Sequence, residues 1–250
     1  MFIENFKFRN SRGIELAGRL YRKNKDQKAG VIFSHGLFSS KDGYKITRMA
    51  ETIVESGYTL LTFDFTFSGE SSGSIKDISI SEEVEDLKCA VNFFKSKGIE
   101  KIHLMGSSMG AAVTILVSSL DLFDIESLIL IAAPLSFEKL VPEIKKDEVK
   151  SLDPDGYTSI QGVMVNNRFI KEIFETEMVE AVKRIKIPTF IVHGKMDAIV
   201  DFGNLEVYIK NCGSECTSLV IDDGDHNLTR DSDISIISEK VKEWLGKFNV

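Results

Sequence analysis

The chain has 250 residues, of which 43% are hydrophobic and 28% are charged. This composition excludes a disordered or fibrous protein, and the length suits a single α/β domain over residues 1–250. The formal net charge of −7 argues against a nucleic-acid partner, because phosphate binding needs a clustered basic face and the lysines are spread along the chain. A small-molecule ligand is therefore expected.

The amino terminus does not read as a secretory signal, and none is expected. Residues 1–13, MFIENFKFRNSRG, place charges between apolar residues and contain no small-residue cleavage site. No apolar run reaches the roughly 18 residues of a membrane helix, so no membrane span is expected. Cys89, Cys212 and Cys216 form an odd set without a second Cys or His pair that would complete a zinc site. Three reduced thiols in a cytoplasmic protein are expected.

The first half of the chain begins with two strands and then alternates strands with helices. Residues 2–8 and 14–21 read as strands joined by the turn signal NSRG, so an antiparallel hairpin is expected at the amino-terminal edge. Short apolar segments predict buried strands over residues 29–36, 58–65, 101–106 and 127–134. Amphipathic or apolar helices are predicted over residues 43–57, 79–98 and 111–120, the second capped by Ser79 or Ser81.

The second half continues this alternation after one long interruption. Strands are predicted over residues 188–194 and 217–224, and a final helix over 234–248. Buried strands that alternate with helices specify an α/β fold with a mainly parallel central sheet and helices on both faces. Residues 135–185 contain helical pieces but no buried-strand pattern, and their apolar residues favour a small inserted cap, or lid, over a disordered linker.

The segment GSSMG, residues 106–110, joins a predicted strand directly to a predicted helix. A G-x-S-x-G match alone is weak evidence, but a strand-to-helix context is typical of a nucleophile elbow. The sharp turn strains Ser108, and a side chain at Gly106 or Gly110 would collide with neighbouring backbone. Ser108 is therefore the candidate nucleophile, and the Ser107 side chain is expected to point away from the reaction site.

A serine hydroxyl needs a positioned base when it attacks a carbonyl carbon. His226 follows the last predicted strand and stands third in a Ser, acid, His chain order, so it is the candidate base. The other histidines have structural explanations. His103 lies within a strand core, His193 ends a strand and is expected to bond the backbone, and His35 is expected to shape the loop after an early strand.

The base needs an acidic partner that selects its tautomer and stabilises its protonated form. Asp197, in HGKMDAIV, follows a predicted strand and lies between the candidate nucleophile and base in the chain. The competing carboxylates are Asp201, Asp222, Asp223 and Asp225. The last three lie too near the candidate base in sequence to reach its Nδ1 easily from a separate strand, and Asp225 is expected to shape the histidine loop.

The oxyanion of an acyl-transfer reaction needs two preorganised donors. The N–H of Met109 follows the nucleophile and begins a helix whose dipole favours negative charge. The second donor is expected from the backbone of Leu37, in the loop after VIFSHG. These residues imply no metal ion and no organic cofactor.

Four motifs in order, HGLF, GSSMG, HGKMDAIV and GDHNL, resemble the α/β-hydrolase superfamily along nearly the whole chain. Within it, the chain is similar to cinnamoyl (feruloyl) esterases and monoacylglycerol-lipase-like enzymes, which carry a cap at about residues 135–185. The resemblance implies an α/β-hydrolase fold, ester hydrolysis without a cofactor, and a cap that helps select the substrate. Many relatives have D-x-R-G-H-G-x-S where this chain reads DFTFSGES, and this altered loop, with Thr66, Phe67 and Ser68, is expected to flank the pocket.

The expected function is a serine esterase that hydrolyses a small or medium acyl or aryl ester through an acyl-enzyme. A thioesterase or an aminopeptidase on the same triad is the alternative, because fold and triad do not determine the leaving group. An aminopeptidase should present carboxylates to the substrate amine, and Glu143, Asp147 and Glu148 of the cap are the candidates. A non-catalytic binding protein is a more distant alternative. The oligomeric state, a homodimer included, stays open.

Overall fold

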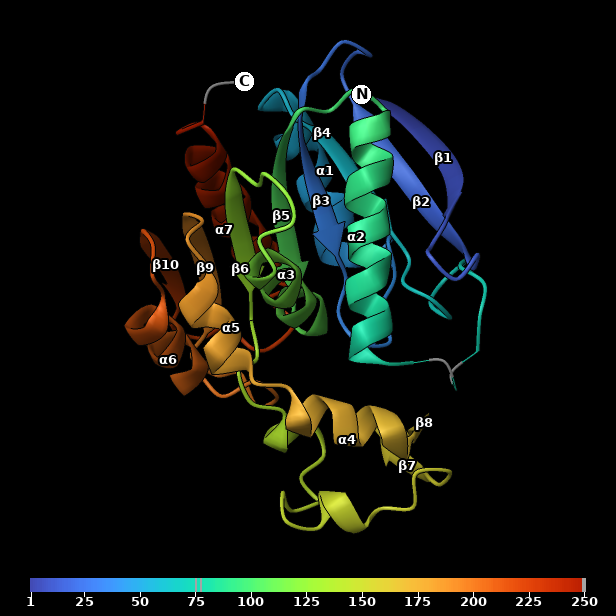
Figure 1. Cartoon of the computed structure of the whole chain (residues 1–250). Helices are drawn as coiled ribbons and strands as arrows, with labels where there is room; N and C mark the ends of the chain where they lie inside the picture. The colour runs from blue at the N-terminus through green and yellow to red at the C-terminus, as the bar shows by residue number, and fades with distance from the viewer. Residues whose placement is uncertain (75, 77, 249–250) are drawn as a thin grey trace.

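A single twisted sheet runs through the molecule (Figure 1). The computed structural model describes residues 1–74, 76 and 78–248, and in this part of the chain eight strands form the sheet in the order β1-β2-β4-β3-β5-β6-β9-β10. The strands are β1 (Phe2–Arg9), β2 (Glu15–Arg22), β3 (Ala29–Ser34), β4 (Thr59–Phe63), β5 (Lys101–Ser107), β6 (Ser127–Ile131), β9 (Thr189–Gly194) and β10 (Cys216–Ile221). The pairings β1–β2 and β2–β4 are antiparallel and the others are parallel, which confirms the predicted sheet and its antiparallel edge.

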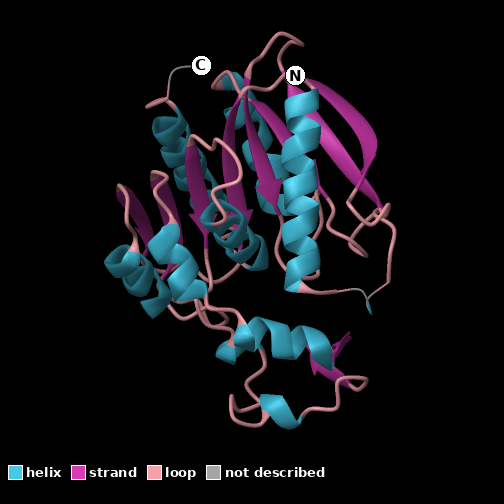
Figure 2. Cartoon of the chain, in the orientation of Figure 1, coloured by secondary structure: helices cyan, strands magenta, loops and turns pink. Residues whose placement is uncertain are grey.

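Helices cover both faces of the sheet (Figure 2). They are α1 (Tyr44–Glu55), α2 (Ile80–Ser96), α3 (Met109–Ser119), α5 (Met178–Arg184), α6 (Gly203–Asn211) and α7 (Asp231–Leu245). Helices α1 and α7 pack together on one face, whereas α2, α3, α5 and α6 form the other layer. Helix α6 was not predicted, although the parallel crossover from β9 to β10 requires a connection of this kind. No helix of the described residues is long and apolar enough to cross a membrane.

The core lies in two layers, one on each face of the sheet. Every residue of β3, β4, β6 and β9 is buried. Successive side chains of a strand point to opposite faces, so Ile32 packs against the α2 and α3 side while Val31 and Phe33 pack against the α1 and α7 side. This double burial explains why the strands read as continuous apolar runs rather than as alternating patterns.

The interrupting segment lies beyond the carboxyl ends of the parallel strands, at the bottom of Figure 1. It contains two short 3-10 turns, a two-stranded hairpin and a helix: Glu138–Leu140, Val149–Ser151, β7 (Tyr157–Ile160), β8 (Val163–Asn166) and α4 (Asn167–Glu175). The hairpin departs from the prediction of helical pieces alone. Its strands are only four residues long and each contains a single buried residue, so they carry no buried-strand pattern. Helix α5, at the end of the predicted cap segment, packs against α3 and α6 instead.

One carboxylate connects helix α4 of the predicted cap segment to the helix layer. Glu172 of α4 accepts the backbone N–H groups of Ile80, at 2.8 Å, and of Ser81, at 2.9 Å. Both belong to the first turn of α2, where N–H groups lack partners within the helix. Ser79 is the N-cap of that helix, since its hydroxyl accepts the N–H of Glu82 at 2.9 Å. The predicted cap segment therefore contacts the amino-terminal end of α2 through α4.

Candidate active site

The turn between β5 and α3 holds Ser108 in a strained conformation. Its φ of 54° and ψ of −122° lie outside the regions that residues with side chains commonly adopt. A Cβ on Gly106 would overlap the carbonyl of Gly110, and a Cβ on Gly110 would overlap that of Ser34. The predicted strain and the predicted need for both glycines are confirmed. Helix α3 begins at Met109, two residues earlier than predicted.

Alanine at position 110 is expected to destabilise the fold. The new methyl group would meet the backbone of Ser34 and His35, which belong to a buried strand and its adjoining loop and have no room to move. We expect Gly110→Ala to lower the free energy of unfolding by about 3 kcal/mol or more, measured by urea denaturation. Gly246→Ala is the matched control, because Gly246 lies at the exposed end of α7 with a φ of −63°. Equal urea midpoints for Gly110→Ala and wild type would contradict the packing argument.

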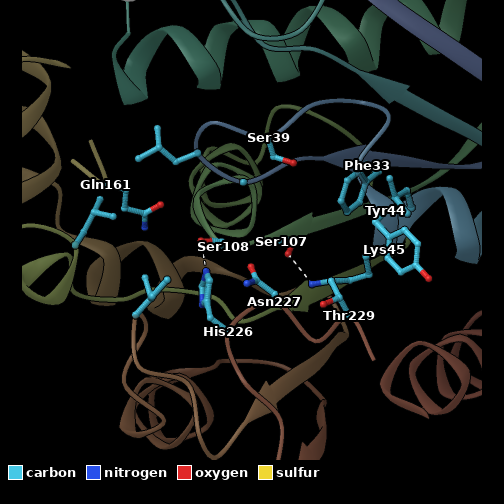
Figure 3. Close-up of a pocket in the computed structure, with 16 residues that line it drawn as sticks. Phe33, Ser39, Tyr44, Lys45, Ser107, Ser108, Gln161, His226, Asn227 and Thr229 are labelled. Atoms are coloured by element: carbon cyan, nitrogen blue, oxygen red, sulfur yellow. Dashed lines mark hydrogen bonds between the residues drawn. The ribbon is translucent and has the colours of Figure 1, made fainter. Parts of the chain in front are cut away.

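The structure brings Ser108, His226 and Asp197 into one hydrogen-bonded chain, although they lie far apart in sequence. The Nε2 atom of His226 is 3.0 Å from Ser108 Oγ (Figure 3). The Nδ1 atom of the same ring is 2.8 Å from Asp197 Oδ2. A carboxylate only accepts hydrogen bonds, so Nδ1 carries the proton and Nε2 accepts from the serine hydroxyl. This is the geometry that a serine nucleophile with a histidine base requires.

The Asp197 carboxylate is buried, and both of its oxygens accept hydrogen bonds. Its Oδ1 accepts the N–H groups of Ile199, at 2.9 Å, and Val200, at 2.8 Å. Burial by itself would raise the pKa of Asp197, but hydrogen bonds from His193, His226 and the Val200 amide outweigh it and hold this pKa well below the ordinary value. The group is therefore ionised at neutral pH and keeps the His226 proton on Nδ1.

The other carboxylates near the histidine loop are engaged elsewhere. Their partners are Lys139 for Asp201, Lys195 for Asp222, Arg230 for Asp223 and the N–H of Leu228 for Asp225. The bond from Leu228 to Asp225, at 2.8 Å, lies within the loop that carries His226. The prediction that Asp225 shapes this loop is confirmed.

Two further histidines occupy structural positions, as predicted. His193 places Nε2 at 3.1 Å from the carbonyl oxygen of Val200, and the same atom is 3.4 Å from Asp197. His103 lies in β5 with Nδ1 at 2.7 Å from Ser127 Oγ, and burial lowers its pKa to about 4. His193 thus braces the loop of the candidate acid, while His103 is a neutral core residue.

His35 organises the loop that follows β3. Its Nδ1 donates to the carbonyl of Gly36 at 2.8 Å, and its Nε2 accepts the N–H of Phe65 at 3.2 Å. Burial lowers the pKa of His35, so the ring is neutral and both nitrogens are occupied by backbone. The prediction that His35 shapes this loop is confirmed.

The two predicted oxyanion donors lie beside the candidate nucleophile. Leu37 and Met109 both line a small cavity with Ser108. Within the described residues, neither backbone N–H has a hydrogen-bond acceptor. An unpaired N–H in a partly buried loop or at a helix start is available to an incoming oxygen.

Ser107 does not point away from the site, and the prediction for its side chain was wrong. Its hydroxyl lies in the same cavity as Ser108 and accepts a hydrogen bond from Lys45 Nζ at 3.2 Å (Figure 3). Lys45 belongs to the first turn of α1 and was missed in the sequence. A lysine on an amphipathic helix reads as a solvent-facing residue, so only the packing of α1 beside the elbow identifies it.

Two cavities meet at Ser108. The larger has a volume of about 260 Å³ and is lined by Phe33, Gly36, Leu37, Ser39, Gly43, Tyr44, Lys45, Ile46, Ser107, Ser108, Leu140, Gln161, Ile199, His226, Asn227 and Thr229. The smaller, about 20 Å³, is lined by Leu37, Ser108, Met109, Pro134, Ser136, Phe137, Leu140, Ile199 and Val200. The larger is thus mixed in polarity and the smaller mainly apolar. The described residues contain no cluster of His, Cys, Asp and Glu suited to a metal ion.

The altered loop after β4 lines neither cavity, so the expectation that it flanks the pocket was wrong. Asp64 is fully buried there, and its carboxylate accepts the N–H groups of Lys41, at 2.6 Å, and Glu70, at 2.9 Å. Thr66 bonds to the buried Asp86 through its N–H, at 2.7 Å, and its hydroxyl, at 2.8 Å. The loop is therefore a structural connection within the main body.

Comparisons with known proteins agree with this architecture. Palmitoyl-protein thioesterase ABHD10 of Bos taurus is 21% identical over 244 residues, which cover 94% of this chain and 79% of that protein. The crystal structure of a putative hydrolase from Agrobacterium vitis is 22% identical, covering 97% of this chain and 99% of that one, with a TM-score of 0.80. The structure of Est1E from Butyrivibrio proteoclasticus with bound ferulic acid has a TM-score of 0.83 and 21% identity, covering 97% and 98% of the two chains.

The family assignment rests on the sequence as well as on the fold. Residues 25–155, just over half of the chain, match the family described as Serine aminopeptidase, S33. This range includes the loop after β3 and the complete elbow, and the structural neighbours share the mainly parallel sheet with its covering helices. The resemblance to α/β-hydrolases is thereby confirmed. The chain belongs to the serine aminopeptidase S33 family of the α/β-hydrolase superfamily.

Proposed function

We propose that this protein is a serine hydrolase of small carboxylic esters. The observation that carries the proposal is the chain from Ser108 through His226 to Asp197, with distances of 3.0 and 2.8 Å, next to the unpaired N–H groups of Leu37 and Met109. Ser108 Oγ attacks the ester carbonyl while His226 takes its proton, and the two N–H groups hold the oxyanion. The ester C–O bond then breaks, His226 protonates the alcohol, and water releases the acid by the same route.

The two cavities take the two parts of the ester. The leaving alcohol receives its proton from His226, so it must lie on the side of that residue. His226 lines the larger cavity and not the smaller one, which favours the larger cavity as the site of the alcohol. The acyl group then lies in the smaller, mainly apolar cavity beside Leu37 and Met109. About 20 Å³ accommodates a group of roughly the size of one water molecule, which favours a short acyl chain such as acetyl.

The lining of the larger cavity argues against an aminopeptidase. Recognition of a substrate ammonium needs carboxylates, and none of the described residues that line this cavity is Asp or Glu. Glu143, Asp147 and Glu148 are exposed and line neither cavity. A thioesterase remains the second candidate, because the relatives named palmitoyl-protein thioesterase align with nearly the whole chain and thioesters use the same acyl-enzyme chemistry.

A series of substrates with one leaving group tests the proposal. We expect kcat/KM for p-nitrophenyl esters to be highest for acetate, lower for butyrate, and at least about tenfold lower for palmitate than for acetate, since one misfitting methylene already costs about 1–3 kcal/mol. Methyl ferulate should be slower than methyl acetate, because the feruloyl group exceeds the small cavity. Acetyl-CoA and an aminoacyl p-nitroanilide complete the set. An optimum at palmitate would contradict the preference for short acyl groups. Turnover confined to acetyl-CoA or to the anilide would contradict ester hydrolysis and indicate a thioesterase or an aminopeptidase.

A further inference from the structure

The larger cavity contains a lysine that the hydrolytic mechanism does not use. Lys45 extends from the first turn of α1 and places its ammonium beside Ser107, the residue next to the candidate nucleophile (Figure 3). None of the described residues that line this cavity is Asp or Glu, so the lining contains no carboxylate to pair with the ammonium. The cavity thus presents one cation among neutral polar and apolar groups.

The ammonium of Lys45 is incompletely paired. An ammonium has three N–H donors, and Lys45 uses one of them, toward Ser107 Oγ at 3.2 Å. Within the described residues it forms no ion pair. The nearby Lys41 is the opposite case, because its ammonium contacts the carboxylates of Asp42, Asp64 and Glu70. The chain therefore neutralises one lysine internally and leaves the other without a counter-ion.

The charged groups around Lys45 are committed to other partners. Burial lowers the pKa of Lys45 to about 8, and the negative charges of Asp225, Asp197 and Asp233 act against this shift. Asp197 binds the histidine, Asp225 binds a loop N–H, and Asp233 pairs with Arg230. The neighbouring cavity groups, the His226 ring and the Tyr44 hydroxyl, supply no negative charge at neutral pH. A partly buried cation without a close counter-ion is unfavourable, and a ligand anion would relieve that cost.

We propose that Lys45 determines substrate specificity by binding a negatively charged group on the alcohol part of the ester. This inference rests on the proposed function, because the alcohol lies in the larger cavity only if His226 protonates it. A carboxylate on the alcohol part, bound in the larger cavity, would accept charge-assisted hydrogen bonds from the two remaining N–H groups of the Lys45 ammonium. Asn227, Thr229 and Gln161 line the same cavity and supply neutral hydrogen-bonding groups around the anion.

A matched pair of esters separates charge recognition from hydrolysis. 4-Acetoxybenzoate and 4-acetoxybenzamide carry the same acetyl group and phenols of similar size, but only the first has an anionic leaving part. We expect Lys45→Met to lower kcat/KM for the benzoate at least about tenfold more than for the benzamide, chiefly through KM. Taking the ratio between variant and wild type removes the difference in intrinsic reactivity between the two esters. Lys45→Gln serves if the methionine variant does not fold, and Lys240→Met, on α7, is the remote control.

The pH dependence adds a readout that a structural role would not move. The cation is present below the pKa of Lys45 and lost above it, so KM of the wild type for the benzoate should rise above about pH 8 while KM for the benzamide stays level. Lys45→Arg should keep the preference for the benzoate and remove this rise, since a guanidinium stays protonated up to about pH 12. Ser107→Ala should also keep the preference, because it removes the hydrogen-bond partner and not the charge.

The outcomes distinguish this inference from the function on which it rests. If wild type hydrolyses both esters and Lys45→Met lowers kcat/KM equally for both, the role of Lys45 is overturned and the proposed esterase function stands. Absence of turnover of both esters by folded wild type, together with no labelling of Ser108 by a fluorophosphonate, overturns the proposed function and this inference with it. A benzoate-specific loss supports both. Protection of Ser108 from labelling by 4-hydroxybenzoate in wild type, but not in Lys45→Met, would support the binding role without any measurement of turnover.

Discussion

Replacement of Ser108 by alanine is expected to reduce ester hydrolysis by about 10³- to 10⁶-fold in kcat/KM. The variant lacks the oxygen that forms the acyl-enzyme, and His226 has no hydroxyl to deprotonate at 3.0 Å. What rate remains would come from the oxyanion donors and from substrate binding alone. The measurement is turnover of p-nitrophenyl acetate by purified wild type and variant, with circular dichroism to show that both are folded.

Ser118→Ala is the matched control for this variant. Ser118 lies on the same helix, α3, and its hydroxyl donates to the carbonyl of Thr114 at 2.7 Å, away from the cavities. It should keep the wild-type rate and still react with a fluorophosphonate, whereas Ser108→Ala should not. If Ser108→Ala retains more than about a tenth of the wild-type rate, another residue must be the nucleophile.

The second large effect is expected for Asp197→Asn. An asparagine can still accept the N–H groups of Ile199 and Val200 through its oxygen, which turns the amide NH₂ toward His226. The histidine would then carry its proton on Nε2 and could not accept one from Ser108. We expect kcat to fall by about 10⁴-fold, the loss typical when an amide replaces a triad carboxylate.

The exposed Asp201 provides a matched control for Asp197→Asn. Asp201→Asn removes an ion pair with Lys139 at the surface and should leave kcat within about twofold of wild type. If Asp197→Asn keeps the wild-type activity and Asp201→Asn loses it, then Asp201 and not Asp197 is the acidic partner of His226.

The charge of Asp197 should also make the stability of the fold depend on pH. Because the pKa of Asp197 in the folded protein lies below the value of about 3.9 in an unfolded chain, its charge stabilises the fold above that pH. This stabilisation is lost as the pH falls further, and Asp197→Asn should remove that part of the acid sensitivity.

The candidate triad could be proposed from sequence because its residues occupy fixed places relative to strands. GSSMG, HGKMDAIV and GDHNL lie at or just beyond the carboxyl ends of β5, β9 and β10, and the carboxyl ends of parallel strands meet at one edge of a sheet. The order of these motifs along the chain therefore implies proximity in space. The same argument placed Leu37 beside the elbow, since β3 and β5 are neighbours.

The features that the sequence did not reveal depend on packing between segments without strong local patterns. The exposed hairpin β7–β8 has strands of four residues, and α6 has nine residues with modest amphipathicity. The predicted orientation of Ser107 was wrong. The elbow constrains the backbone at Ser108, but the direction of the Ser107 side chain depends on which residue packs beside it. That partner, Lys45, is contributed by α1, and no motif connects the two residues.

The sequence by itself determined the strands of the main sheet and most of its helices, the mainly parallel arrangement and the positions of the candidate nucleophile, base and acid. Each of these follows from local periodicity, from turn chemistry or from motifs of a few residues. Only the tertiary structure decided the size of the two cavities, the contact of α4 with α2 through Glu172 and the absence of a close carboxylate at the Lys45 ammonium within the described residues. Cavity shape and charge pairing are sums over side chains from distant segments, so they exist only once those segments have packed together.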